Sequence, residues 1–375
     1  MIDCSLWVPA NPYYSAYPGL LWVGRVKCNP DYFSLGVKNE REELYDREEE
    51  LSALENSAHP ITTLTGIRRL GKSSLLATGL KRRNALVVDF RGTGPNPSPL
   101  FLLNRFEEAL NSSGLRNLWE HLSKRVSSIT LGPLGVSFAK TKPLTVSFAT
   151  LFDAINEYAE RAGTDFVVAF DEAQEARGYK PLIGAIARSY DYNRRIRFVL
   201  AGSQTGLLND FLSIQDPASP LYGRYVYELA LKRFSKQDSL EFLRRGFEAC
   251  GAEPLNIEEA VQRLDGIVGW LVYYGYMCLN EDADLARVVD SAVNLELKEL
   301  SKLRGKYYRL ILKAVTLGAN TWSEIYRYVK ANTEVLSDAS FNEALGRLVK
   351  YSVLEKKDEE YMIPDPITNE AARRL

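Results

Sequence analysis

Histidine, cysteine and methionine are scarce in this sequence: its 375 residues include two histidines, four cysteines and three methionines. The cysteines lie far apart, at positions 4, 28, 250 and 278, and form no Cys-x-x-Cys pair. So few sulfur and nitrogen ligands argue against a zinc site and against a histidine-based metal centre. Scattered cysteines in a chain of this length indicate a reducing compartment.

A long, uninterrupted hydrophobic run is also missing. The one uncharged stretch of membrane-spanning length, residues 4–24, contains three prolines, which a plain helix does not accommodate. Its start carries Asp3 where a signal peptide has a basic residue. A second uncharged run, residues 266–280, is too short to span a bilayer and favours a buried helix. The formal net charge of −1 predicts no partner. We expect a cytoplasmic protein with no membrane partner.

Short apolar strands alternate with helices through residues 38–234, after an aromatic and proline-rich extension at residues 1–37 that we expect to pack against the rest of the protein. Apolar strands of this kind are typical of a parallel sheet with helices on both faces, so the expected fold class is α/β. Strands are predicted at 61–65, 85–90, 165–172, 196–203 and 225–231, a hairpin at 127–139, a helix that starts near Asp46 or Arg47, and helical structure over 100–125.

The rest of the chain is predicted to be largely helical. Residues 235–303 carry no strand signal. Residues 304–364 fit three short helices and a two-stranded hairpin with a turn near Asp358. The third of these helices has one apolar face, formed by Phe341, Leu345, Leu348 and Val349. We therefore expect an α/β domain at 38–234, a helical domain at 235–303 and a third domain at 304–375.

The strongest motif is Gly-x-x-x-x-Gly-Lys-Ser, from Gly66 to Ser73, between a predicted strand and a predicted helix. Its glycines allow backbone N–H groups to point at phosphate oxygens, and the helix N-terminus adds partial positive charge. We expect Lys72 to reach the β- and γ-phosphates and the Ser73 hydroxyl to hold Mg²⁺. The predicted nucleotide-binding residues of this loop are Gly66, Arg68, Arg69, Gly71, Lys72, Ser73 and Ser74.

Two acids, Asp171 and Glu172, end an apolar strand and complete the predicted site. We expect Asp171 to hold Mg²⁺ and Glu172 to polarise the attacking water. The alternative is that both acids only cap the following helix. A glutamate in this place usually goes with an extra strand between the loop strand and the acidic strand, and residues 196–203 fit that strand. Ser203 at its tip either senses the γ-phosphate and the water or simply begins a turn.

Three arginines are further candidates. Arg224 precedes the last predicted strand, where an arginine can reach the phosphates of a neighbouring subunit and stabilise the transition state. The alternative for Arg224 is a surface or ion-paired side chain. Of Arg68 and Arg69, we expect one to contact phosphate and the other to pair with an acid.

Taken in order, these segments resemble the archaeal ATPase family, in the STAND/AAA+ branch of P-loop ATPases. They include "TGIRRLGKSSLL", "VVAFDEAQE", "FVLAGSQTGLL" and "GIVGWLVYYG", and the resemblance covers about residues 38–303. It implies an ATP-binding α/β domain, a helical lid and a C-terminal winged helix. It implies that Asp171 and Glu172 form the Walker B pair and that Arg224 is at the finger position. It also implies that Tyr45 and Arg47, in "YDREEEL", lie near the adenine.

One position departs from the family pattern. Members often have Gly-x-Pro where this chain has Gly266, Ile267 and Val268. Losing that proline removes a rigid element near the base and the lid. Lid coupling and base selectivity are the properties that this change puts in doubt.

The C-terminal segment is locally basic. Residues 301–357 contain eleven lysines or arginines and five acids, an excess that suits contacts to DNA phosphates. Against DNA binding, Glu343 and Gly346 lie on the face that would read bases, and winged helices also dock proteins. Double-stranded DNA and a protein partner both stay open.

Three functions fit these residues, all with ATP or ADP and Mg²⁺ as cofactors. The first is an Mg²⁺-dependent ATPase whose turnover drives lid and winged-helix rearrangement, as a homo-oligomer with Arg224 acting in trans. The second is a slow nucleotide-dependent switch that binds DNA or a protein, and the third is a scaffold whose nucleotide is structural. They differ in their need for Glu172: a motor uses it in every cycle, a switch uses it to reset, and a scaffold does not use it.

Overall fold

The computed structural model describes residues 28–94, 96–126, 129–132, 135–138, 147–253 and 256–375. Most of the aromatic extension, including the uncharged stretch at 4–24, lies outside these ranges. Within them, no helix combines the length and the apolar character that crossing a membrane requires.

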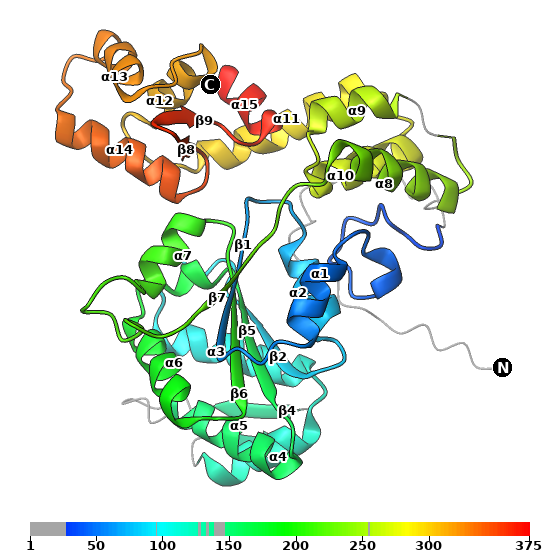
Figure 1. The fold of residues 1–375 in the computed structure, drawn as a ribbon, viewed down its shortest axis with the longest axis vertical. Helices are drawn as coiled ribbons and strands as arrows, with labels where there is room; N and C mark the ends of the chain where they lie inside the picture. Colours follow the sequence, from blue (N-terminus) through cyan, green and yellow to red (C-terminus); the bar gives the residue numbers. More distant parts are fainter. Residues whose placement is uncertain (1–27, 95, 127–128, 133–134, 139–146, 254–255) are drawn as a thin grey trace.

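A five-stranded parallel sheet lies at the centre of the α/β part, in the order β2-β5-β6-β1-β7 (Figure 1). The predicted extra strand is confirmed, because β6 lies between the loop strand β1 and the acidic strand β5. All five strands point the same way, so their carboxyl ends meet at one edge, which is where the predicted site residues follow them. The strands are β1 (Ile61–Thr65), β2 (Asn84–Asp89), β5 (Phe166–Asp171), β6 (Ile196–Ala201) and β7 (Tyr227–Ala230).

Helices cover both faces of the sheet, as predicted. Along β5, Val167 and Ala169 pack in the core that contains α1 and α2, whereas Phe166, Val168 and Phe170 pack in the core with α3 and α5. The alternation of side chains along a strand explains why β5 is apolar at every position before its terminal Asp171. The helices are α1 (Glu48–Glu55), α2 (Lys72–Leu80), α3 (Pro99–Ser112), α4 (Arg116–Arg125), α5 (Phe148–Ala162), α6 (Lys180–Tyr192) and α7 (Thr205–Leu212), with short 3-10 turns η2 (Arg41–Glu43) and η3 (Ala173–Ala176).

Two details refine the prediction for this part of the chain. Residues 100–125 are helical, as predicted, and form two helices, because the chain turns between them at Gly114, which has a φ of +68° that few side chains adopt. The predicted hairpin is present as the antiparallel strands β3 (Ile129–Gly132) and β4 (Gly135–Phe138).

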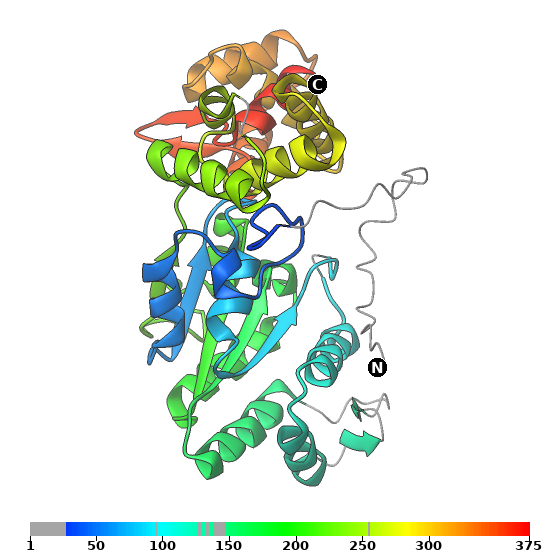
Figure 2. The same cartoon turned by 90° about the vertical axis from the view of Figure 1, so that its right-hand side faces the viewer.

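The C-terminal half lies beyond the carboxyl-end edge of the sheet (Figures 1 and 2). The lid helices α8 to α11 come first, followed by a winged helix of three helices and a two-stranded wing, as expected. A last helix, α15, was not predicted; Asp365 caps it and Pro366 occupies its first turn. These elements are α8 (Lys236–Ala249), α9 (Ile257–Leu264), α10 (Val268–Glu281), α11 (Leu285–Ser301), α12 (Tyr308–Thr316), α13 (Trp322–Ala331), α14 (Asp338–Lys350), β8 (Glu355–Lys357), β9 (Glu360–Met362) and α15 (Pro366–Arg373).

Two of the three cysteines within the described residues are paired. Cys28 and Cys250 form a disulfide with an S–S distance of 2.04 Å, across a sequence separation of 222 residues. The inference of a reducing compartment rested on cysteines that showed no local pairing pattern, and this pair removes that basis. Sequence spacing cannot reveal a pair that only the folded chain brings together.

Candidate nucleotide-binding and hydrolysis site

The glycine-rich loop connects β1 to the N-terminus of α2 and needs both of its glycines. Gly66 has a φ of +136°, and a β-carbon there would approach the Leu231 carbonyl oxygen to 3.0 Å. Gly71 has a φ of +89° directly before the helix. This backbone presents the free N–H groups of the first helical turn toward the edge of the sheet, which is the arrangement that binds phosphate.

Lys72 is buried and turned back onto the loop. Its Nζ donates to the carbonyl oxygens of Gly66 at 2.7 Å and Ile67 at 2.8 Å. Burial lowers the pKa of this ammonium to about 8, although Glu172 and Asp171 act in the opposite direction. A phosphate in the loop would offer Lys72 the anionic partner that these neutral carbonyls lack.

Ser73 and Asp171 lie next to each other as the predicted metal ligands should. The Ser73 hydroxyl donates to Asp171 Oδ2 at 2.6 Å, and Asp171 is 4% exposed. Burial raises the pKa of Asp171, because a carboxylate enclosed in this way is poorly solvated in its charged form. Two adjacent oxygen ligands at a phosphate loop fit Mg²⁺, which prefers a hydroxyl or carboxylate and the phosphates of its substrate.

Glu172 is held by two side chains at the tips of neighbouring strands. Its Oε2 accepts from the Ser203 hydroxyl at 2.9 Å and from the Gln174 amide. Its backbone has a φ of +52°, a left-handed conformation that is uncommon for glutamate and concentrates at functional sites. The predicted base and the predicted sensor residue are therefore in direct contact. Gln174, which is 1% exposed, was missed by the sequence analysis.

One open cleft of about 830 Å³ runs along the loop, and its lining includes Gly71, Lys72, Ser73, Glu172 and Ser203. The cleft also contains Arg91, which the sequence analysis missed and whose Nε donates to Asp89 Oδ2 at 2.7 Å. Arg91 follows β2, and Asp89 is paired in register with Asp171. Its position just past the carboxyl end of a strand is the signal that could have identified it.

A second, more apolar pocket of about 400 Å³ shares Arg69, Gly71 and Ser74 with the cleft. Tyr45 and Arg47 both line it, and their contact with a base stays a prediction. The guanidinium of Arg47 contacts groups of the protein itself. It lies 4.8 Å from the centre of the Phe234 ring and donates to the Lys232 carbonyl oxygen at 2.8 Å. The apolar pocket therefore adjoins the glycine-rich loop, through the three residues that it shares with the cleft.

Val268, at the position of the missing proline, also lines the apolar pocket. It is the first residue of α10, where proline is favoured but not required. The next N–H, that of Gly269, donates to the Arg69 carbonyl oxygen at 2.8 Å. The contact between the loop and the lid therefore forms without the proline.

The three predicted arginines all pair with acids inside the chain. Arg68 contacts Glu299 at 3.0 Å and Arg69 pairs with Glu296, where the sequence predicted one such pair. Arg224 does not line the cleft, and it forms two hydrogen bonds to Asp191, at 3.1 and 2.6 Å. Phosphate contacts by these arginines, in this chain or a neighbouring one, stay predictions.

Comparison with known proteins agrees with this geometry. Residues 44–274 match the model of a family described as an ATPase domain predominantly from Archaea. The Walker-type ATPase PABY2304 of Pyrococcus abyssi is 36% identical, with a TM-score of 0.80, over 91% of this chain and 99% of that one. The ORC2 protein of Aeropyrum pernix in its ADP form is 14% identical, with a TM-score of 0.56, over 94% of this chain and 99% of that one, and supports the fold alone. No curated protein matches. A phosphate loop joined to a buried acidic strand, together with the family match over most of the chain, shows that this protein belongs to the family of ATPase domains found predominantly in Archaea.

Proposed function

We propose that this protein hydrolyses ATP with Mg²⁺ and that its nucleotide state changes how the lid and the winged helix sit on the sheet domain. The observation that carries the first half is the pair of contacts at the strand tips. Ser73 touches Asp171, and Ser203 touches Glu172, so the metal ligands and the base with its sensor lie along one edge.

The residues divide the work as follows. Lys72 leaves the loop carbonyls and binds the β- and γ-phosphates. Ser73 and Asp171 would hold Mg²⁺, which would neutralise phosphate charge. The Glu172 carboxylate accepts the proton of the attacking water. Ser203, already bonded to its Oε2, fixes the carboxylate and lies where the γ-phosphate would leave.

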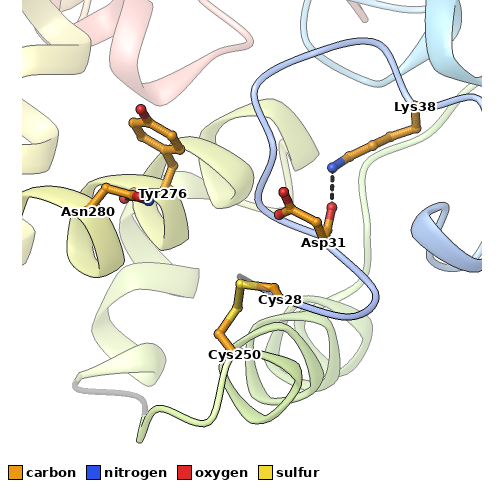
Figure 3. The surroundings of a disulfide bond; sticks show 6 residues. All are labelled: Cys28, Asp31, Lys38, Cys250, Tyr276 and Asn280. Atoms are coloured by element: carbon orange, nitrogen blue, oxygen red, sulfur yellow. Dashed lines mark hydrogen bonds between the residues drawn. A yellow bond between two sulfur atoms is a disulfide. The ribbon is translucent and has the colours of Figure 1, made fainter. Parts of the chain in front are cut away.

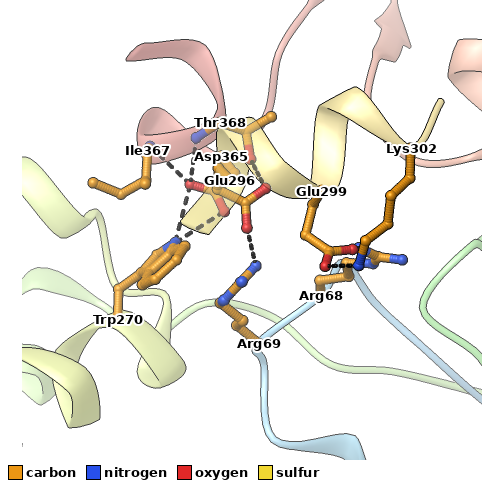
Figure 4. Close-up of polar contacts among 9 residues, drawn as sticks. All are labelled: Arg68, Arg69, Trp270, Glu296, Glu299, Lys302, Asp365, Ile367 and Thr368. Carbon is orange, nitrogen blue, oxygen red and sulfur yellow. Dashed lines mark hydrogen bonds and ion pairs between the residues drawn. The ribbon is translucent and has the colours of Figure 1, made fainter. Parts of the chain in front are cut away.

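The first link to the C-terminal half runs through the glycine-rich loop itself (Figure 4). Arg69 pairs with the buried Glu296 of α11, and its guanidinium lies 4.0 Å from the centre of the Trp270 ring. Glu296 accepts from the Thr368 hydroxyl of α15 at 3.0 Å, and the Trp270 indole donates to Asp365 at 2.9 Å. A phosphate that repositions this loop would therefore pull on α11 and α15.

The second link starts at the sensor strand. The Thr205 N–H, two residues after Ser203, donates to the Ser352 hydroxyl at 3.1 Å. Gly206 packs so closely on α14 that a β-carbon there would lie 2.6 Å from Lys350 Cα, and Lys350 Nζ contacts Asp210 at 2.7 Å. Movement of the sensor tip during hydrolysis would be transmitted to the winged helix at this point.

The test of hydrolysis compares two glutamates in the same cleft. Glu172→Gln is expected to keep ATP affinity and to lower turnover by at least about a hundredfold, the range of a lost general base. Glu175→Gln, a matched control three residues away, is expected to keep turnover within about twofold. Turnover that survives Glu172→Gln would assign the base elsewhere and contradict the proposal.

A slow switch remains the second candidate, favoured by the docking of α14 on α7. In that case nucleotide binding releases α14 from α7, or presents the exposed face of α14 to DNA or a protein, and hydrolysis restores the starting arrangement. A homo-oligomeric ATPase would instead free Arg224 from Asp191 to act in trans. Turnover per chain measured across protein concentrations, with and without duplex DNA, separates these: a rise with concentration favours Arg224 in trans, a rise with DNA favours a DNA partner, and a flat, slow rate favours the switch.

A further inference from the structure

Residues 28–38, here called the strap, precede the segment that matches the family and are fixed to the lid at one end (Figure 3). Cys28 is bonded to Cys250 at the end of α8, and the Asn29 N–H donates to the Ala249 carbonyl oxygen at 3.2 Å. The strap therefore begins as part of the lid.

Phe33 inserts into the lid between two helices. Its ring occupies the space that side chains at Gly246 of α8 and Gly275 of α10 would need, since β-carbons there would lie 2.2 and 2.5 Å from ring atoms. The ring also makes edge contacts with Phe242 and Phe247, at centroid distances of 5.7 and 5.1 Å. Glycines at both contact points show that this docking site is shaped for an aromatic ring.

The other end of the strap is attached to the helix that follows the glycine-rich loop. The Lys38 N–H donates to the Ser74 hydroxyl at 3.1 Å, and the Thr78 hydroxyl donates to the Lys38 carbonyl oxygen at 3.3 Å. Both acceptor and donor belong to α2, whose first turn holds Lys72 and Ser73. The strap thus bridges the lid and the phosphate-binding helix.

Between its two ends the strap is folded around a buried charge. The Lys38 ammonium donates to the Asp31 carbonyl oxygen (Figure 3). It also donates to the Ser34 hydroxyl, and Lys38 is 6% exposed. An ammonium enclosed by its own loop holds that loop in one shape, because unfolding it would break these hydrogen bonds together. This part of the strap faces the apolar pocket, and the strap residues that line it are Tyr32, Ser34, Leu35, Gly36 and Lys38.

We propose that the strap is a wall of the nucleotide pocket and that its disulfide to the lid retards the release of bound nucleotide. This inference rests on the proposed function, since it assumes that the apolar pocket holds the base of ATP or ADP. Nucleotide can leave this side of the pocket only when the lid and α2 move apart or the strap detaches. The covalent bond at Cys28 prevents the strap from detaching at its lid end.

The disulfide also makes the wall responsive to thiol reductants. A dithiol that is oxidised to its own disulfide supplies the two electrons and two protons that convert Cys28 and Cys250 to thiols. The lid end of the strap is then held by non-covalent contacts such as those of Phe33 and the Asn29 N–H. Detachment becomes a local opening, which occurs far more often than separation of two packed parts.

The experiment measures release of a fluorescent ribose-labelled ADP, chased with excess unlabelled ADP by stopped flow, from the full-length oxidised protein. Gly275→Ala places a methyl group against Phe33 and is expected to speed release about tenfold. Gly184→Ala, at a helical glycine with no atom within 4 Å of the added carbon, is the matched control and is expected to leave the rate unchanged. Circular dichroism confirms that each variant is folded.

A second pair of variants keeps the test decisive if Gly275→Ala does not fold. Cys28→Ser, or wild type reduced with a dithiol, is expected to release ADP about tenfold faster, whereas Cys278→Ser, which changes the free cysteine of α10, is expected to match wild type. Release that stays within about twofold of the controls in both Cys28→Ser and reduced wild type would overturn the role of the strap. Failure of wild type to bind ADP at all would instead overturn the proposed function.

Discussion

The pair of Arg69 and Glu296 leads to a prediction about stability and nucleotide affinity together. Glu296 is 4% exposed, and beyond Arg69 its main polar contact is the Thr368 hydroxyl. Arg69→Ala would leave this carboxylate buried with its charge uncompensated, a loss that typically costs about 3–5 kcal/mol. Because Arg69 itself is partly exposed, we expect the lower end, about 3 kcal/mol, including roughly 0.5–1 kcal/mol from the Trp270 ring.

We expect Glu296→Gln to remove most of this loss of stability. In the Glu296→Gln background no buried charge is left unpaired at this position, so Arg69→Ala should then cost only about 1 kcal/mol, and the coupling energy of the cycle should be about 2 kcal/mol. Urea unfolding followed by tryptophan fluorescence measures all four proteins, with Trp270 reporting directly from the contact. Arg68→Ala, which breaks a half-exposed pair, is the control and should cost less than about 1 kcal/mol.

A coupling energy below about 0.5 kcal/mol would refute the buried pair as the link between loop and lid. The ATP affinities of the same four proteins test whether Arg69 also contacts phosphate. If its role is confined to the lid, Arg69→Ala leaves affinity unaltered when Glu296→Gln is already present. A loss of affinity that persists in the doubly substituted protein would assign Arg69 a direct phosphate contact.

Three further predictions concern the cleft and the α7 contact. In the nucleotide-free protein Lys72 loses its proton near pH 8, whereas bound phosphates would hold that proton. ATP affinity should therefore fall with rising pH, by nearly tenfold per pH unit above about pH 8. Calorimetry with proton-uptake measurement checks this, and an affinity that does not change with pH contradicts it. Ser203→Ala should lower kcat by roughly ten- to a hundredfold with little change in KM, since it frees Glu172; a change confined to KM would show that Ser203 serves binding. Gly206→Val should push α14 off α7 and speed amide exchange in α14 by about tenfold or more. Gly346→Ala, with open space around the added carbon, should not speed it. Equal exchange rates in the two variants would contradict the proposed link between the sensor strand and the winged helix.

The central part of the site was predictable because it depends on short-range signals. A strand, two glycines and a helix start define the phosphate loop, and parallel strands bring Asp171, Glu172 and Ser203 to the same edge whatever the helices between them do. The extra strand β6 followed from the same argument. Tyr45 and Arg47 came from family resemblance rather than from any local pattern.

The parts that were missed depend on contacts between distant segments. Nothing near Cys28 or Phe33 in the sequence shows that Cys250, Gly246 and Gly275 will meet them. The acids that neutralise Arg68 and Arg69 belong to α11, which is remote from the loop in the sequence. By contrast, α15 could have been predicted, since Asp365 before Pro366 is a helix-start signal.

The division of the protein into two apolar cores does not follow the division of its sequence into domains. One face of the sheet shares a continuous core with α1, α2, the lid helices and the winged helix, whereas the opposite face has a core of its own. A chain cut short after the lid would uncover α11 where α15 now lies, with Ile367, Ala371 and Ala372 no longer filling that surface. Such a fragment should self-associate through the exposed apolar surface, so the solubility of the preceding helices depends on the C-terminal residues that cover them.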